Sequence, residues 1–430
     1  MVESRYNLNF SFIHTADLHL DRAFSDASLI PKKYNNAVLE AFTNLINFAI
    51  EKNVDFVLIA GDTFDSENPD FQAKLQFKKQ INKLDNAGIK VFMICGNHDP
   101  LNSYKKRTFD YDENSNIKIV GLNTCNEKEK FVVFNKENIP CALIHALSFR
   151  NKEFKENPAN YFQMPTAEEK ALFNIGLLHC DLNGSQNSPY APCSGSDLKE
   201  LNYNYWALGH IHIPPETEDT IKYAGTIQGR NSKECGAYGF RYICVNDGII
   251  SKNEFIESDI IQYLNINVDI SQIKDSTEIN GLISSEFNNI AKKDKFYFVK
   301  ITLIGETDFY DELIKNNFNV INSIKEDLDS EFGFRLSISE IINKTTAKVY
   351  MEELKSDMGI VGEIIKTVEN QEVTDNIMKI LEKRYLNEIK NNFNIQDDEF
   401  EQIKEEITNT AKQTCISICG KLYNNEKEGL

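Results

Sequence analysis

A short apolar stretch that ends in glycine and aspartate is the feature that most constrains what this chain can fold into. The run Phe56–Ala60 is typical of a buried parallel strand, and Gly61 then places Asp62 at its carboxyl end. Open α/β sheets bind their ligands at this edge, and glycine leaves room for an ion to approach. We therefore interpret Asp62 as a ligand that bridges two metal ions, although most aspartates after a strand only cap the next turn.

The same pattern, an apolar run followed by residue types that bind metals, recurs four more times. Six of the seven histidines of the chain lie in these segments, which chance placement would not produce. The residues that follow the runs are Asp17 and His19, Asn97 and His98, His179, and His210 and His212. Residues two apart in an extended segment project to the same side, so Asp17 and His19 can bind one ion together. Carboxylate oxygens mixed with imidazole nitrogens suit manganese, iron or zinc better than calcium.

Five ordered motifs of the chain resemble those of a known enzyme family. The family is the calcineurin-like metallophosphoesterases, and the motifs are DLH, GDTFD, GNHD, LHCD and GHIH. Within it, the chain is similar to the SbcD-type DNA repair exonucleases, and most closely to the YhaO type, in HTADLHLD, GDTFDSENP and YAGTIQGRNSKECGAYGF. The signature segments span residues 12–240, and a weaker similarity of layout continues to the C-terminus.

The resemblance implies two divalent metal ions, for which we expect manganese. The first ion would be bound by Asp17, His19 and His212, the second by Asn97, His179 and His210, and both by Asp62. His98 would be the catalytic histidine, which stabilises the transition state or donates a proton to the leaving oxygen. Asp65 could orient His98 by a hydrogen bond. Two-metal sites of this kind hydrolyse phosphate esters with water, so no protein nucleophile is expected.

The resemblance also implies an α/β fold with three domains. A four-layer αββα metallophosphoesterase sandwich would span residues 1–260. It would be followed by a small α+β capping domain that positions DNA, over residues 261–348, and by a helical C-terminal region over residues 349–430. In SbcD-type nucleases such a tail docks on a coiled-coil ATPase of the SbcC type. The apolar stripe that includes Ile377 and Ile380 could equally pack on its own domain, because stripes at helical spacing are usually core.

Apolar periodicity predicts the secondary structure between the motifs. It indicates helices over residues 34–52 and 71–87 and several strands within 117–147. His145 lies in the last of these strands and is expected to be structural. For His14 a plain buried histidine and a direct participant in the site both remain open.

The net charge of −18 argues against a DNA-binding chain, which usually carries a basic footprint. Residues 1–260 carry −7 and residues 261–430 carry −11, so most of the acidic excess lies in the C-terminal part. Bound cations would offset some of it, and a partner could supply the basic groove. The best local candidates for phosphate contacts are Lys105, Lys106 and Arg107, with a merely solubilising role equally open.

Composition narrows the cellular setting. The chain is 41% hydrophobic, has no stretch apolar enough to span a bilayer and begins without a signal peptide, so we expect a cytoplasmic protein with no membrane partner. Nine cysteines without C-x-x-C spacing predict reduced thiols and no zinc site. The sequence contains no G-x-x-x-x-G-K-[ST] loop, which argues against ATP hydrolysis by this chain.

Three functions remain open from the sequence. The first is a manganese-dependent DNA exonuclease or endonuclease of DNA repair that works with an SbcC-type ATPase. The second is a phosphodiesterase or phosphatase for a small molecule, although family members of that kind are usually shorter. The third is a scaffold with a vestigial metal site, against which the complete ligand set argues. Dimers are common among SbcD-type nucleases, so a homodimer is open as well, but the sequence identifies no dimer face.

Overall fold

The computed structural model describes residues 8–67, 69–104, 116–122, 124, 126–185, 187–213, 220–275, 277–310, 313, 317–348, 351–393 and 395–428. The basic cluster Lys105, Lys106 and Arg107 lies outside the described residues. The chain divides into two compact units. The first comprises residues 1–264, 292–298 and 334–337, and the second comprises residues 265–291, 299–333 and 338–430.

A six-stranded sheet in the first unit carries half of the predicted site. Its strand order is β13-β12-β1-β2-β3-β4. The strands are β1 (Phe10–Thr15), β2 (Phe56–Ala60), β3 (Lys90–Ile94), β4 (Ile117–Ile119), β12 (Gly239–Asn246) and β13 (Ile249–Glu257). Strands β1 to β4 run parallel, whereas the hairpin β12–β13 joins β1 antiparallel. The apolar run before Asp62 is therefore a central strand, buried along its whole length.

A five-stranded sheet carries the other half of the site. Its strand order is β11-β10-β7-β6-β5. The strands are β5 (Lys128–Phe134), β6 (Pro140–Leu147), β7 (Phe173–His179), β10 (Tyr205–Gly209) and β11 (Ile221–Tyr223). All neighbours are parallel except β5, which pairs antiparallel with β6. The strands expected within 117–147 are β4, β5 and β6.

The two sheets face each other through aromatic side chains. Phe12 and Phe56 of the first sheet stack with ring centroids 4.9 Å apart. The ring of Phe12 also meets the ring of Tyr205 from the second sheet edge-on at 5.6 Å. These residues belong to one buried cluster that draws on both sheets. The middle of the sandwich is therefore a dry apolar core that fixes how the two sheets meet at the site.

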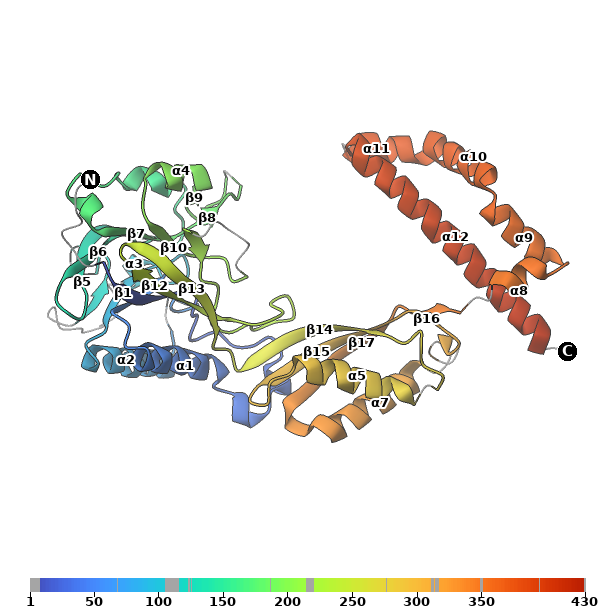
Figure 1. Ribbon diagram of the computed structural model, residues 1–430, viewed down its shortest axis with the longest axis horizontal. Helices are drawn as coiled ribbons and strands as arrows, with labels where there is room; N and C mark the ends of the chain where they lie inside the picture. Colours follow the sequence, from blue (N-terminus) through green and yellow to red (C-terminus); the bar gives the residue numbers. More distant parts are fainter. Residues whose placement is uncertain are drawn as a thin grey trace. The chain divides into compact units, whose positions relative to one another are not determined.

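Helices cover the outer face of each sheet (Figure 1). Helices α1 (Ala37–Glu51) and α2 (Phe71–Asn86) pack on the first sheet, close to where the apolar periodicity predicts them. On the second sheet, the indole N–H of Trp206 donates to the carbonyl of Leu198 in α4 (Gly195–Glu200) at 3.2 Å. The predicted four-layer αββα architecture is confirmed.

The second unit contains α+β elements followed by helices. A three-stranded sheet, whose strands lie mostly in this unit, has the order β14-β15-β17, from β14 (Ile261–Asp269), β15 (Phe296–Ile304) and β17 (Leu336–Asn343). Two helices, α5 (Glu278–Ile290) and α7 (Asn317–Phe332), pack together through the rings of Phe287 and Phe332. The predicted α+β region and helical tail are therefore both present. The domain boundaries expected at residues 260 and 348 remain predictions.

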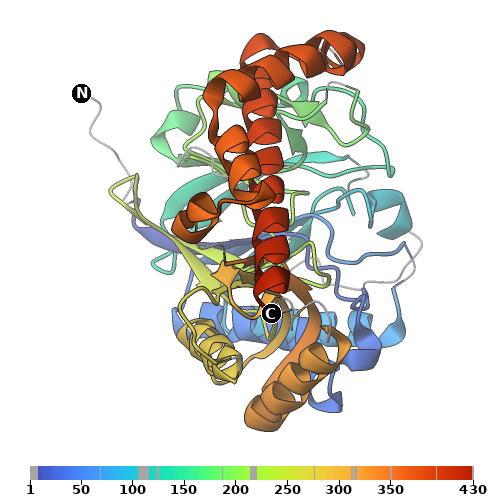
Figure 2. The same ribbon diagram turned by 90° about the vertical axis from the view of Figure 1, so that its right-hand side faces the viewer.

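The chain ends in a group of helices. They are α8 (Met351–Ser356), α9 (Ile360–Glu369), α10 (Gln371–Leu381), a π-helical turn (Glu382–Leu386), α11 (Asn387–Phe393) and α12 (Asp397–Glu428). The long helix α12 runs alongside α9, where Val361, Ile365 and Cys419 share a small buried cluster (Figure 2). Among the described residues, no helix combines the length and the apolar character needed to cross a membrane.

Candidate metal centre

The predicted ligands lie at one edge of the sandwich, beyond the carboxyl ends of parallel strands from both sheets. Asp17 and His19 follow β1, Asp62 follows β2, Asn97 follows β3, His179 ends β7, and His210 and His212 follow β10. The sheets approach each other closely here, because a Cβ atom at Gly209 would lie 2.0 Å from the carbonyl oxygen of Ala60. Segments far apart in the sequence therefore meet at a single site.

Several ligand loops share an uncommon backbone conformation. Asp17, His19 and Asp62 have φ angles of 50°, 42° and 49°, in the left-handed region that residues other than glycine rarely adopt. Two backbone hydrogen bonds hold these loops together, from Asp17 N to Gly61 O at 3.1 Å and from His19 N to Asp62 O at 3.0 Å. Such strain persists only where the surroundings enforce it, and it gathers at functional sites.

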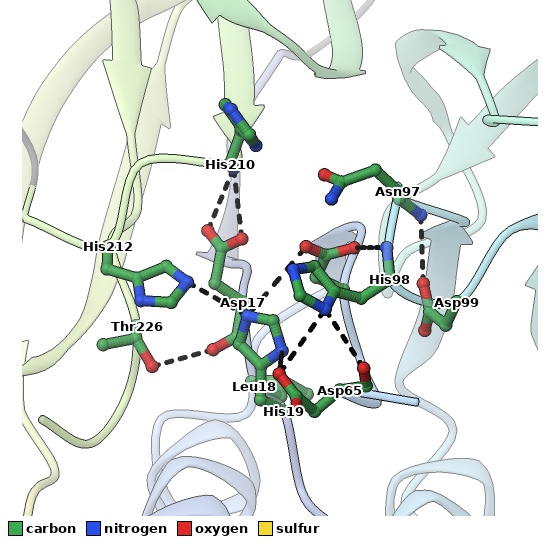
Figure 3. Close-up of polar contacts among 12 residues, drawn as sticks. Asp17, Leu18, His19, Asp65, Asn97, His98, Asp99, His210, His212 and Thr226 are labelled. Atoms are coloured by element: carbon green, nitrogen blue, oxygen red, sulfur yellow. Dashed lines mark hydrogen bonds and ion pairs between the residues drawn. The ribbon is translucent and has the colours of Figure 1, made fainter. Parts of the chain in front are cut away.

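One candidate ion site is formed by Asp17, His19 and His212, whose ligand atoms lie within 4.8 Å of one another. Figure 3 shows the rings of His19 and His212 turned toward each other beside the Asp17 carboxylate, with their Nε2 atoms 3.0 Å apart. Burial lowers the pKa of His19 to about 3, so its imidazole is neutral and can bind a cation. The backbone N–H of His210 donates to both carboxylate oxygens of Asp17, at 3.1 and 3.0 Å.

A second candidate ion site is formed by Asp17, Asp62 and His179, again within 4.8 Å. Asn97 joins it, because its Oδ1 lies 2.9 Å from His179 Nε2. The other ring nitrogen of His179, Nδ1, lies 2.9 Å from the carbonyl oxygen of Ala60, which leaves Nε2 facing the site. Burial favours the neutral imidazole of His179, but the charge of Asp62 outweighs it and raises the pKa to about 9.

Asp62 lies between the two candidate sites. Its Oδ2 is 3.4 Å from His179 Nε2 in one site and 3.9 Å from His19 Nε2 in the other. Burial alone would raise the pKa of Asp62, but the charge of His179 and its hydrogen bond with Asp62 hold that pKa well below its usual range. This is the placement expected of a ligand shared by two cations.

His210 occupies a different place from the other predicted ligands. Its ring meets the rings of His179 and Tyr190 at centroid distances of 5.2 and 5.0 Å. Burial and the charge of His179 lower the pKa of His210 to about 3. Within the described part of the chain, His210 belongs to none of the tight clusters, so its assignment to the second ion remains a prediction.

His98 lies on the open side of the site, with 39% of its side chain exposed. Its backbone N–H donates to Asp62 Oδ1 at 2.9 Å, and its ring Nδ1 lies 3.0 Å from the backbone carbonyl oxygen of Asp65. The Asp65 carboxylate is 3.5 Å from His98 Nδ1 and closer to His19 Nδ1, at 3.2 Å. Contact with His19 lowers the pKa of Asp65 to about 2. Asp65 thus reaches His98 mainly through its backbone.

An open pocket of about 630 Å³ begins at this side of the site. It is lined by Asp65, Ser66, Glu67, Asn97, His98, Lys152, Glu153 and Tyr190. Its size falls within the range of pockets that hold nucleotide-sized ligands. A phosphate ester in this pocket would reach Asn97 and His98 first.

Four residues that support the site were not predicted from the sequence. Asp99 accepts from Gly96 N at 3.0 Å and from Phe64 N at 3.1 Å, which ties the β2 and β3 loops together. The others are Thr226, Arg230 and Glu234, which contact the loops around Asp17 and His212. Burial would raise the pKa of Glu234, but its hydrogen bond with His212 lowers it to about 2. The last three lie within YAGTIQGRNSKECGAYGF, a segment that signalled only a family resemblance.

The two histidines left aside are both held by structural contacts. His14 is fully buried, with ring nitrogens 3.0 Å from the hydroxyl of Tyr205 and 3.0 Å from the carbonyl oxygen of Leu208. Burial lowers the pKa of His14 to about 3. The ring of His145 stacks on Tyr203 at 4.3 Å. Neither histidine lies among the candidate ligands.

The donor set fits divalent cations. It combines buried carboxylates, imidazoles and an amide oxygen, which together match manganese, iron or zinc. Two glycines leave room for it, because a Cβ atom at Gly61 would lie 2.6 Å from His179 Nδ1 and one at Gly96 would lie 2.1 Å from Asp62 Oδ1. No side chain larger than hydrogen fits at either position without moving a ligand.

Gly96→Ala is therefore expected to displace Asp62 and to reduce hydrolysis of bis-para-nitrophenyl phosphate by about 100-fold, the scale of a misplacement near 1 Å in an active site. Gly281→Ala is the matched control, because a Cβ atom at Gly281 in α5 has nothing within 4 Å. Initial rates and bound metal are measured for both variants. Full activity in Gly96→Ala would show that the Asp62 position is not critical.

Comparison with known proteins agrees with this site. The family described as calcineurin-like phosphoesterase matches residues 10–214. The chain is 33% identical over 305 residues to the uncharacterized metallophosphoesterase YhaO of Bacillus subtilis (strain 168), covering 69% of this chain and 72% of that protein. It is also similar to two solved structures. A dimetal phosphatase from Danio rerio has a TM-score of 0.35 and 11% identity, covering 56% of this chain and 94% of that one. The calcineurin-like phosphoesterase YfkN from Bacillus subtilis has a TM-score of 0.36 and 12% identity, and the match covers 66% of this chain and 98% of that one. The chain belongs to the calcineurin-like metallophosphoesterase family.

Proposed function

We propose that this metallophosphoesterase is a DNA phosphodiesterase of the SbcD type, an exonuclease or endonuclease of DNA repair that uses two manganese ions. The observation that carries the proposal is the position of Asp62, between two ligand clusters and bonded to the backbone of His98. The clustered ligands argue against the alternative of a scaffold with a vestigial metal site, because a lost function would not preserve them.

The protein side chains have distinct tasks in this reaction. Two bound cations would polarise the phosphoryl group and activate the attacking water. Asn97 contributes a neutral oxygen, so it adds no negative charge where an anionic substrate must bind. His98 lies on the open side and can stabilise the transition state or protonate the leaving oxygen. No protein nucleophile is required.

DNA as the substrate is supported by the motifs and by the size of the chain. The segments HTADLHLD and YAGTIQGRNSKECGAYGF are similar to those of SbcD-type nucleases, and a second unit of α+β and helical elements follows the site. Tyr190 in the pocket wall offers an aromatic ring on which a base can stack, while Lys152 in the same wall is paired with Glu67 at 3.1 Å. The net charge of −18 favours the second candidate, a small-molecule phosphodiesterase, unless a partner supplies the basic surface.

An SbcC-type ATPase partner is supported by the surface of the helical tail. The predicted apolar stripe on α10 and the turns after it is largely exposed, with exposed fractions of 54% for both Ile377 and Ile380 and 58% for Tyr385. Exposed apolar surfaces of this kind mark sites of protein interaction. A homodimer is similarly supported by Phe71 and Leu75 of α2, which are 74% and 47% exposed.

The test is digestion of end-labelled linear DNA by the purified chain with added manganese. The same protein is assayed on bis-para-nitrophenyl phosphate, and Asp62→Ala is the inactive control. We expect manganese-dependent shortening of the DNA that disappears in the variant. Cleavage of the small diester while DNA stays intact, even after the SbcC-type ATPase is added, would reject the nuclease in favour of the small-molecule enzyme.

A further inference from the structure

His212 is held from behind by a carboxylate that has no part in the proposed reaction. Its Nδ1 lies 2.8 Å from Glu234 Oε1, while its Nε2 lies 3.0 Å from His19 Nε2 on the side of the metal centre. A carboxylate only accepts hydrogen bonds, so Nδ1 of His212 carries the proton and Nε2 keeps its lone pair. The contact therefore sets both the tautomer and the direction of the ring.

Glu234 is itself fixed by the backbone around it. Its second carboxylate oxygen, Oε2, accepts from Arg230 N at 2.7 Å, and its own backbone N–H donates to Asn231 O at 2.9 Å. The residue is only 8% exposed. Because both oxygens have partners, the carboxylate has one well-defined orientation to impose on His212.

The segment 226–234 joins the two loops that supply this ion site. The Thr226 hydroxyl donates to the carbonyl of Asp17 at 2.7 Å, and the Thr226 backbone N–H donates to His212 O at 3.2 Å. The buried guanidinium of Arg230 donates to Leu18 O at 3.3 Å and to the Thr226 hydroxyl at 2.9 Å. Glu234 thus acts from a segment that is anchored on both sides of the ion site.

We propose that Glu234 is a positioning residue for the cation bound by Asp17, His19 and His212, an inference that rests on the proposed two-metal function. The second site does not depend on it, because His179 is oriented by the backbone carbonyl of Ala60. Partners that orient a ligating histidine contribute about 10–100-fold to metal affinity. Loss of Glu234 should therefore weaken binding of the ion held by Asp17, His19 and His212 and leave binding of the second ion unchanged.

The test is titration of the metal-free, full-length protein with Mn²⁺, with binding followed by calorimetry and free Mn²⁺ by electron paramagnetic resonance. Glu234→Ala is expected to lower the affinity for one of the two Mn²⁺ ions by about 10–100-fold and to leave the affinity for the other unchanged. Glu234→Gln should lie between Glu234→Ala and the wild type. Activity lost at limiting Mn²⁺ should return at excess Mn²⁺, so the maximal rate changes little.

The matched control is Glu169→Gln. Glu169 also joins a basic side chain to a backbone amide, with Oε1 2.8 Å from Lys130 Nζ and Oε2 accepting from Thr166 N at 3.0 Å, but it lies away from the metal centre. Unchanged affinities in Glu234→Ala, equal weakening of both ions, or the same loss in the control would overturn the proposal. If Glu234→Ala does not fold, the titration of Glu234→Gln decides by the same criteria.

The proposed function fails separately from this inference. A wild-type protein that binds no Mn²⁺ would reject the two-metal function itself. A wild-type protein that binds Mn²⁺ but leaves DNA intact, even after the SbcC-type ATPase is added, would reject only DNA as the substrate, and the titration would still test Glu234.

Discussion

Replacing Asp62 with alanine is expected to abolish measurable phosphodiester hydrolysis. Asp62 lies 3.4 Å from His179 and 3.9 Å from His19, so its removal takes the shared ligand from both candidate ion sites. Metal ions contribute several kcal/mol to such reactions, and each 1.4 kcal/mol is about tenfold in rate, so the loss should be about 1,000-fold or more. Initial rates on bis-para-nitrophenyl phosphate and metal content after dialysis measure it.

Asp62→Asn separates charge from shape in the same experiment. The asparagine can keep the hydrogen bond from His98 N, which Asp62 Oδ1 accepts at 2.9 Å, but it removes the negative charge. We expect Asp62→Asn to lose metal and activity nearly as fully as alanine, with a melting temperature close to that of the wild type. Full activity with unchanged metal content in either variant would show that Asp62 is not the bridging ligand.

Much of the fold could be predicted because strands and site share one local signal. A run such as Phe56–Ala60 must be buried, and its abrupt end in Gly61 and Asp62 marks where the strand leaves the core. The same reasoning located every strand that precedes a predicted ligand. The helix positions followed equally directly from apolar spacing, as for α1.

The supporting contacts could not be predicted because they depend on tertiary structure. Glu234 reaches His212 through a loop, and no periodicity relates the two positions. Asp99 stands next to His98, yet its carboxylate turns away to bind Gly96 N and Phe64 N. The Asp65 carboxylate likewise lies nearer to His19 than to His98, and the spacing of these residues in the sequence does not predict this difference.

Whether the apolar stripe of the tail is core or surface also required the structure. The spacing of Ile377, Ile380 and Leu386 indicates a helical face but not what covers that face. In the described chain Leu386 is buried, whereas Ile377 and Ile380 are exposed. The sequence therefore predicts the helix, but only the structure shows which of its apolar side chains are covered.

Replacing His98 with alanine is expected to reduce hydrolysis by about 100- to 10,000-fold, the range of general acid–base catalysis, while leaving metal binding intact. The reason is geometric. The backbone N–H of His98 donates to the ligand Asp62, and alanine keeps that donor, whereas the ring meets the ring of His19 only edge-on, at a centroid distance of 4.9 Å, and is 39% exposed. Metal content equal to that of the wild type is therefore part of the expected result, and its loss would show that His98 is a ligand.

The size of the loss on two substrates distinguishes the two roles open to His98. Para-nitrophenolate is stable as an anion and needs no proton when it leaves, whereas the alkoxide released from a DNA phosphodiester does. If His98 protonates the leaving oxygen, His98→Ala should lose far more activity on DNA than on bis-para-nitrophenyl phosphate. Equal losses on both substrates would assign the ring to stabilising charge on the phosphoryl group, because that task does not depend on the leaving group.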